Sequence, residues 1–453
     1  MIGVNEYIDR SLSGPILKEV EFDLRYSKKV RELAADFSIE YNADEVVTDD
    51  KTAASIFEAG VELLASVGLY NKDTRRIIEL TQKEIMEVAK SRQHSITFGS
   101  GFNTVTINER RPTNAHPPIL FLGPVCPLSE AIYVPACLSF LKIPENMGCL
   151  GGFLIEAEGF ENRSGYPHEL IVTAKEVTLN KEAIRRAGRP GLFGCLAASA
   201  VTPAAIFNTF GPGMCTSMES VVPLQIMPEL KIIWDKLNLA IFCQHHDIHP
   251  LTDGMGVVGG YARNPAESAV TLVANILANW GFSHASVAIA WSTDMKGHWT
   301  AKKPLLWTNS AVVKAFDLNT SNPMFSFGTA LAGPMTEMAL FESAAYSVAY
   351  PASGIEVIIG GTTGNGADLD YTAGLHGQMV VDVTKVASGL ERDKANEIVN
   401  KIVARYESLY DNPPRGLTFQ ECYDVVRVQP KPEFVILYEN VKIELNKMGV
   451  PFN

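Results

Sequence analysis

The sequence predicts an α/β fold, a (β/α)₈ TIM barrel with an N-terminal helical and hairpin extension and with C-terminal helices. Two observations support a barrel: short apolar runs alternate with long amphipathic segments from about residue 118, and 453 residues suffice for one barrel with an appendage. A third disfavours a doubly wound sheet, because the early runs lack its G-x-G-x-x-G motif. We expect the extension over residues 1–115 and the barrel, including the C-terminal helices, over residues 116–453.

The N-terminal extension is predicted to contain helices followed by a β-hairpin. Asp49 or Asp50 can cap a helix that ends at Gly68, because apolar residues recur at helical spacing between them. The motif Thr81-x-x-Glu84 matches a capping box that opens the next helix. The segment SITFGSGFNTVTIN then alternates apolar and polar residues around glycines, which is typical of a hairpin.

The barrel strands and helices are predicted from the apolar runs and the segments between them. The predicted strands are 119–122, 147–155, 192–197, 239–243, 286–291, 324–327 and 355–359. The predicted helices are 169–187, 218–237, 264–281, 303–317 and 334–350. A closed barrel needs eight strands, so one strand is missing from this set or misplaced in it. The last stretch of the chain is predicted to be helical only, with a capping box at Thr418-x-x-Glu421.

Composition excludes several classes of protein. With 46% hydrophobic and 20% charged residues the chain is globular, and its formal net charge of −12 with scattered Lys and Arg argues against nucleic acid as a partner. The sequence lacks a signal peptide pattern and any apolar run of roughly 18 residues, which predicts a cytoplasmic protein without membrane association. Seven cysteines without a C-x-x-C pair indicate reduced thiols.

Candidate functional residues lie where the predicted strands end, because reacting groups in a parallel barrel sit at the C-terminal ends of its strands. These candidates are Glu156, Glu158, Cys195, His245, His246, Asp253 and Trp291. The acidic residues would make the barrel mouth electronegative and attract a cation, and Trp291 would add a cation–π face. In the alternative interpretation some of these acids pair with arginines such as Arg189 or Arg263.

The segment FCQHHDIHPLTDG, residues 242–254, is the densest cluster of potential ligands. Cys243 or Cys195 with two of its histidines could bind zinc, which would activate a thiol or act as a Lewis acid. The spacing matches no standard zinc signature, and the alternative is that the histidines bond backbone or substrate at a strand end.

Two further features each have a chemical and a structural interpretation. Cys195 lies in an apolar context, where a lone cysteine is most often a small hydrophobe. The glycine-rich run 358–370 could cradle a phosphate through backbone N–H groups or form a flexible turn, and it lacks the G-K-[ST] ending of a P-loop.

Several strings resemble segments of the monomethylamine:corrinoid methyltransferases, in the same order over most of the chain and least at residues 1–40. They are IFEAGVELLASVGLYNKDTRRI in the N-terminal helices, AGRPG at 187–191, GGYA at 259–262, AGPMTEM at 332–338 and TFQECYDV at 418–425. The resemblance implies a (β/α)₈ barrel that forms a homo-oligomer, a hexamer in the family. It also implies transfer of a methyl group from a methylated amine to the Co(I) of a separate corrinoid (cobalamin) protein that docks at the barrel mouth.

One departure from the family changes the expected chemistry. The family carries pyrrolysine four positions after AGRPG, where this chain has Cys195, and a thiol is a nucleophile that cannot add an amine as an imine does. By the same resemblance, family glutamates fall at Asp253 and near Glu219, whereas a glutamine and a tyrosine fall at Phe327 and Thr329. The shell around pyrrolysine is therefore altered while an acidic charge is kept.

These observations predict a pyrrolysine-independent, corrinoid-dependent methyltransferase that acts on a quaternary or otherwise cationic N-methyl or S-methyl compound. The predicted catalytic residues are Cys195, Asp253 and Glu219. The predicted substrate-binding residues are Glu156, Glu158, Trp291, Phe327, Thr329, His245 and His246. The alternatives are a zinc-dependent barrel enzyme that uses the 243–253 cluster, and a non-catalytic paralogue that binds a cation or a corrinoid protein.

Overall fold

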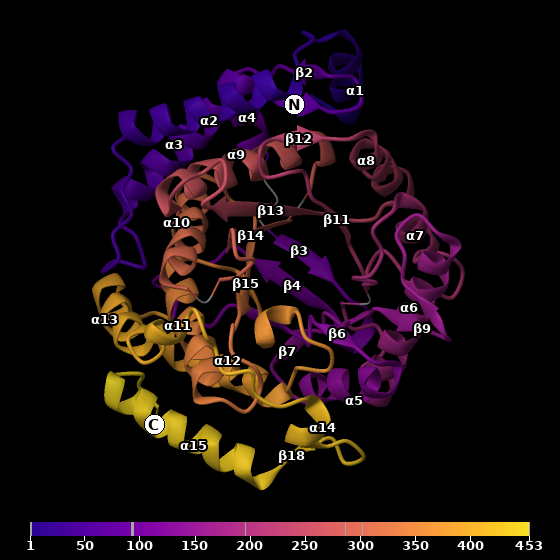
Figure 1. Ribbon diagram of the computed structural model, residues 1–453, viewed down its shortest axis with the longest axis vertical. Helices are drawn as coiled ribbons and strands as arrows, with labels where there is room; N and C mark the ends of the chain where they lie inside the picture. The colour runs from indigo at the N-terminus through magenta and orange to yellow at the C-terminus, as the bar shows by residue number, and fades with distance from the viewer. Residues whose placement is uncertain (1, 92–94, 195, 286, 301, 453) are drawn as a thin grey trace.

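The computed structural model describes residues 2–91, 95–194, 196–285, 287–300 and 302–452. Its main sheet has parallel strands in the order β11-β13-β14-β15-β16-β5-β7, and helices surround this sheet (Figure 1). The strands are β5 (Ile119–Leu122), β7 (Asn146–Gly148), β11 (Val222–Leu224), β13 (Pro250–Val258), β14 (Val287–Asp294), β15 (Met324–Thr329) and β16 (Val357–Thr362). The sequence is thus correct in predicting a parallel sheet covered by helices.

Residues 192–194 close the sheet into a barrel. Phe193 forms a parallel bridge with Gly148 of β7, and its carbonyl accepts a hydrogen bond of 3.0 Å from the Cys149 N–H. On the other side the Gly194 N–H donates to the carbonyl of Glu219, just before β11, at 2.9 Å. This segment therefore takes the place of the third strand, and the fold is a (β/α)₈ barrel.

The barrel helices pack on the outside of the strands and are themselves partly covered. They are α5 (Glu130–Leu141), α6 (Pro167–Arg186), α8 (Trp234–His246), α9 (Pro265–Ser283), α10 (Lys303–Asn319), α11 (Glu337–Ser353) and α12 (Gly374–Ala387). Figure 1 shows N-terminal helices beside α9 and α10 and C-terminal helices beside α11. The helices that cover them are α2 (Glu19–Asp36), α3 (Asp50–Val67), α13 (Arg392–Val403) and α15 (Pro432–Met448). Because both sides of α9 and α11 are packed, nearly all of their residues are buried.

Short elements complete the chain. In the N-terminal extension they are α1 (Val4–Ser13), β1 (Leu69–Asn71) and β2 (Arg76–Ile78), and β12 (Lys231–Ile232) adds to the sheet of β1 and β2. The barrel loops contain β6 (Pro127–Leu128), β8 (Phe153–Leu154), β9 (Glu156–Ala157), β10 (Phe160–Glu161) and α7 (Pro203–Asn208). Near the C-terminus are α14 (Phe419–Cys422), β17 (Tyr423–Asp424) and β18 (Gln429–Pro430). No helix of the described residues is both long and apolar enough to cross a membrane.

The predicted helix starts in the extension are confirmed. The carboxylate of Asp49 accepts a hydrogen bond from the Thr52 N–H at the start of α3, which ends at Gly68. Thr81 and Glu84 form the capping box that opens α4 (Gln82–Ala89). Local sequence therefore determines where these helices begin.

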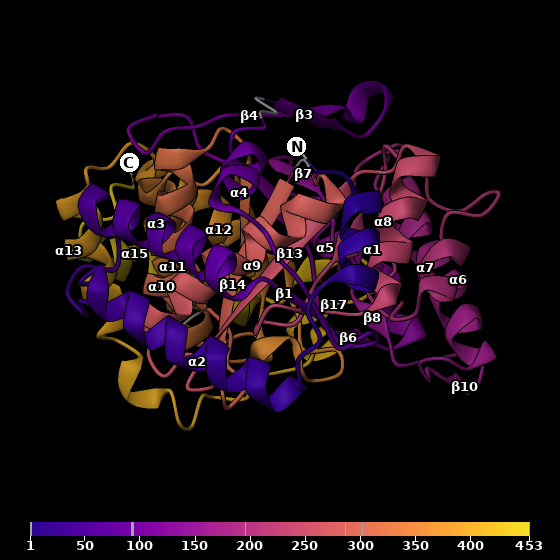
Figure 2. The same cartoon turned by 90° about the horizontal axis from the view of Figure 1, so that it is seen from above.

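The predicted hairpin is also confirmed, and it covers the N-terminal end of the barrel. It consists of β3 (Ser95–Phe98) and β4 (Val105–Asn108), which Figure 2 shows lying across one end of the barrel. The ring of Phe98 packs on that of Phe193 with centroids 4.3 Å apart, and Phe193 in turn packs on Phe121. The apolar side of the hairpin thus continues the core inside the barrel.

Three predicted elements differ from the structure, and helical periodicity explains the first of them. The predicted strand 239–243 lies inside α8, where Leu237, Ala240 and Cys243 are buried at helical spacing. The predicted helix 218–237 contains β11, β12 and only the start of α8. The predicted strand 147–155 is divided between β7 and β8.

The strand missing from the prediction is β13. Its sequence PLTDGMGVV contains two glycines and no continuous apolar run. The glycines are required by packing, because a Cβ at Gly254 would lie 2.5 Å from Cγ1 of Ile276 on α9. Close approach of α9 therefore removes the apolar signal by which a strand is found in a sequence.

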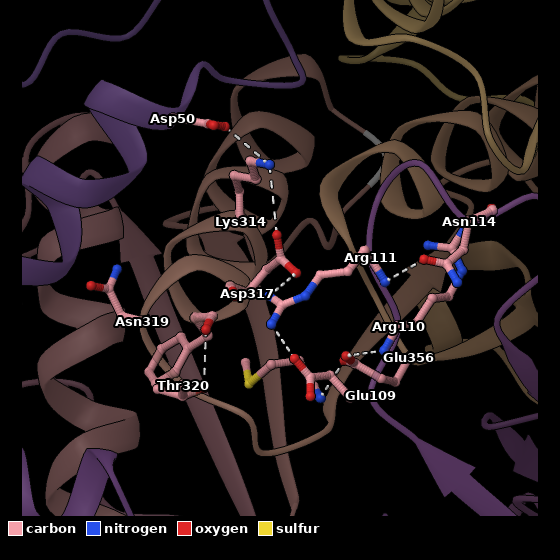
Figure 3. Close-up of polar contacts among 12 residues, drawn as sticks. Asp50, Glu109, Arg110, Arg111, Asn114, Lys314, Asp317, Asn319, Thr320 and Glu356 are labelled. Atoms are coloured by element: carbon pink, nitrogen blue, oxygen red, sulfur yellow. Dashed lines mark hydrogen bonds and ion pairs between the residues drawn. The ribbon is translucent and has the colours of Figure 1, made fainter. Parts of the chain in front are cut away.

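A buried polar cluster connects the strand starts at the hairpin end of the barrel (Figure 3). The carboxylate of Glu356 accepts hydrogen bonds from the backbone N–H of Arg110 at 3.2 Å and of Met324 at 2.8 Å. The guanidinium of Arg110, only 2% exposed, donates to the carbonyls of Asn114, His116 and Pro351. These bonds give hydrogen-bond partners to backbone N–H and C=O groups that have none within a helix or strand.

Candidate active site

A cavity of about 400 Å³ lies inside the barrel toward the C-terminal ends of its strands. Most of the side chains that line it are apolar or aromatic. Among the described residues, its charged lining side chains are Asp253 from β13 and Lys236 from the first turn of α8. An apolar cavity with a few polar groups is typical of a small-molecule site.

Asp253 is held by a tryptophan from the neighbouring strand. The indole Nε1–H of Trp291 on β14 donates to Oδ1 of Asp253 at 2.6 Å. Burial raises the pKa of Asp253 to about 6, although the Trp291 hydrogen bond and the positive charge of Lys236 lower it. At neutral pH the carboxylate is therefore ionised but poorly hydrated, which suits it to bind a cation.

Three aromatic rings surround the same part of the cavity. The ring centroid of Trp291 lies 5.1 Å from that of Trp299 and 6.3 Å from that of Phe327, and the latter two are 6.4 Å apart. We call Trp291, Trp299 and Phe327 the aromatic cluster. Aromatic faces beside a carboxylate bind methylated ammonium groups, because the methyl groups are apolar and carry positive charge.

Trp299, which sequence reasoning missed, lies in the loop between β14 and α10 and is held there by the glycine-rich run. The side chain of Asn365 accepts a hydrogen bond from the Trp299 N–H at 3.0 Å and donates to the Gly297 carbonyl at 2.7 Å. Asn365 has a φ of 56°, a conformation that asparagine tolerates better than most residues. The run 358–370 thus supports one wall of the cavity.

The support from Asn365 can be tested with substitutions that respect its backbone. We expect Asn365→Gly to raise KM for the methyl donor about 5–20-fold with little change in kcat, because two hydrogen bonds that hold the Trp299 loop are lost. Asn365→Asp, which keeps an acceptor for the Trp299 N–H, should fall between this variant and the wild type. Steady-state kinetics checks this, and an unchanged KM in Asn365→Gly would contradict it.

Lys236 is the second cavity residue that sequence reasoning missed. Burial lowers the pKa of Lys236, while the negative charge of Asp253 raises it. Within the described parts of the chain, its ammonium makes neither a hydrogen bond nor an ion pair. Gln225 lines the cavity next to it.

Three of the predicted acidic residues lie outside the cavity. Glu156 and Glu158 lie on the exposed ribbon of β9 and β10, and Glu158 forms an ion pair with Lys175 on α6 at 3.3 Å. Glu219 lies in an outer groove, where its Oε2 is 3.8 Å from Nζ of Lys181 on α6. The charges of Glu158 and Glu219 are therefore directed toward α6 rather than toward Asp253.

Thr329 and the predicted histidines also lie away from the cavity lining. Thr329 is buried at the end of β15, where its backbone N–H donates to Oγ1 of Thr300 at 2.9 Å. His245 and His246 are exposed at the C-terminal end of α8. This placement follows from the helix, which replaces the predicted strand end.

The proposed zinc ligands of the 242–254 segment are dispersed. His249 packs against Phe98 of the hairpin, with ring centroids 5.5 Å apart, whereas Asp253 faces the cavity. No group of three or more His, Cys, Asp or Glu side chains in the described residues could hold a metal ion. Cys195 lies outside the described residues, and its described neighbour Leu196 lines the cavity.

Comparison with known proteins identifies the family. The model of the family described as "Monomethylamine methyltransferase MtmB" matches residues 2–450. The chain is 29% identical to monomethylamine methyltransferase MtmB1 of Methanosarcina acetivorans and 28% identical to MtmB of Methanosarcina mazei, each over 99% of this chain and 98% of the relative. The crystal structure of monomethylamine methyltransferase from Methanosarcina barkeri superimposes with a TM-score of 0.94 at 27% identity, covering 99% of both chains. This chain therefore belongs to the monomethylamine methyltransferase family and is a transferase.

Proposed function

We propose that this protein moves a methyl group from a cationic N-methyl or S-methyl compound, such as a quaternary ammonium ion, to the Co(I) of a corrinoid protein. The observation that carries the proposal is the carboxylate of Asp253 beside the aromatic cluster. This arrangement would attract a methylated cation and hold it by charge and by its methyl groups. Family membership supports methyl transfer as the reaction.

The cationic donor follows from leaving-group chemistry. When the C–N bond of a quaternary ammonium ion breaks, its electron pair stays on nitrogen and a neutral amine departs without a proton. The methyl carbon takes the electron pair that Co(I) supplies. Such a donor needs no imine to activate it, which is consistent with a cysteine at position 195.

The methyl acceptor would approach from the C-terminal ends of the barrel strands. The hairpin of β3 and β4 covers the opposite end, and a cavity of about 400 Å³ holds a small donor but not a corrinoid as well. The corrinoid would thus stay with its own protein, and the residues of this chain would bind and orient the donor only.

The test is a transfer assay. The protein is mixed with a reduced Co(I) corrinoid protein and with quaternary, tertiary, secondary and primary methylamines and sulfonium compounds, and the cobalamin spectrum is followed. We expect methylation of cobalt with at least one quaternary or sulfonium donor and none with monomethylamine. Cation binding without methylation by any donor would favour the non-catalytic alternative.

A further inference from the structure

Lys236 raises a question that the proposed function leaves open, because a cation-binding cavity gains nothing from a second positive charge. The side chain lies in the first turn of α8 and lines the cavity together with Asp253. The side chain is half-buried, and withdrawing an ammonium group even partly from water is costly unless an anion or hydrogen bonds compensate it. Its position therefore indicates a partner that arrives with the ligand.

Asp253 does not supply that partner. Its carboxylate interacts electrostatically with Lys236, yet the described residues contain no ion pair between them, and Oδ1 of Asp253 is engaged by Trp291. The two oppositely charged side chains thus line one cavity without an ion pair between them. A molecule that carries both charges would compensate each of them.

Two other roles for Lys236 explain the arrangement less well. A proton donor is unnecessary if the departing amine is already neutral, as the proposed reaction requires. A purely structural lysine would direct its ammonium to solvent, and Lys236 does reach a second, shallower groove shared with Gln225 and Met255. That role does not explain why the same side chain also lines the cavity that holds Asp253.

We infer that the methyl donor is a small zwitterion, a methylated ammonium or sulfonium group with a carboxylate a few bonds away. The cationic end binds between Asp253 and the aromatic cluster, and the carboxylate binds Lys236. The inference rests on the proposed function for the identity of the reacting group. It adds the second charge, by which the cavity would distinguish amino-acid-like donors from simple methylamines.

The direct test compares two ligands that differ only in the anion. Trimethylammonioacetate carries the carboxylate, and its methyl ester keeps the cation but loses the negative charge; longer pairs, with two or three carbons between the groups, are tested likewise. Binding is followed by the fluorescence of the cavity tryptophans, which requires no corrinoid protein. We expect at least one acid to bind at least 10-fold more tightly than its ester.

Variants then assign the preference to Lys236. Lys236→Met should remove the preference for the acid while changing the affinity for the ester less than about 3-fold, and Lys236→Arg should keep part of it. Lys51→Met, on the exposed surface of α3, is the matched control and should bind as the wild type does.

The outcomes separate this inference from the proposed function. Equal binding of acid and ester by the wild type, binding of neither, or an undiminished preference in Lys236→Met would overturn the zwitterion. Failure of every donor to methylate cobalt would instead overturn the proposed reaction, because the binding comparison does not depend on transfer.

Discussion

Asp253→Asn is expected to lower the affinity for a cationic donor and the rate of methyl transfer at least 30-fold. The substitution removes the anionic partner of a desolvated cation, which costs about 2–5 kcal/mol, while the amide oxygen can still accept the Trp291 hydrogen bond. Ligand titration and the transfer assay measure both effects. Wild-type binding should itself weaken as the pH falls through about 6, because the carboxylate is then protonated.

The same variant should be more stable than the wild type at high pH. The pKa of Asp253 is raised in the folded protein from its usual 3.8 to about 6, so folding favours the protonated carboxyl. The wild type therefore loses stability as the pH rises from about 4 through 6, by about 3 kcal/mol in total, and the uncharged asparagine avoids this loss. Urea denaturation of both proteins at pH 4 and pH 8 measures whether the variant gains stability relative to the wild type as the pH rises.

Glu219→Gln is the matched control for this prediction. Glu219 is a carboxylate of the predicted catalytic set, but the structure places it in the outer groove beside Lys181. Its neutralisation is expected to leave donor binding and methyl transfer unchanged. A loss as large as that of Asp253→Asn would mean that the catalytic site extends beyond the cavity.

Arg110→Leu should destabilise the fold by about 3–5 kcal/mol. It leaves three backbone carbonyls without their donor, that of Pro351 fully buried and those of Asn114 and His116 partly buried. The midpoint of urea denaturation measures the change.

The neighbouring arginine provides the comparison. Arg111 has a half-exposed side chain and forms ion pairs with Asp317 and Glu109, so Arg111→Leu should cost at most about 1 kcal/mol (Figure 3). Equal losses of unfolding free energy in the two variants would show that burial does not determine how much each arginine stabilises the fold.

The candidate site residues chosen from the sequence that line the cavity all belong to a strand. These residues are Asp253, Trp291 and Phe327. Lys236 and Trp299 were missed because neither follows an apolar run: one lies in the first turn of a helix and the other in a loop held by Asn365.

The misplaced histidines show the limit of interpreting a short apolar run. Leu239–Cys243 is compatible with a strand and with one face of a helix, and only its packing decides between them. Since the fourth strand was placed there, His245 and His246 were assigned to the barrel mouth. The predicted fold class is nevertheless correct, because it depends on the alternation of many segments rather than on one of them.

The hairpin across the N-terminal end of the barrel has a kinetic consequence. With that end covered, the proposed donor and the proposed acceptor protein would share one approach to the cavity. Under the proposed reaction, binding would follow a compulsory order in which the donor enters first, and the demethylated product would leave only after the acceptor has dissociated. Excess acceptor would therefore inhibit turnover by occupying the entrance before the donor arrives.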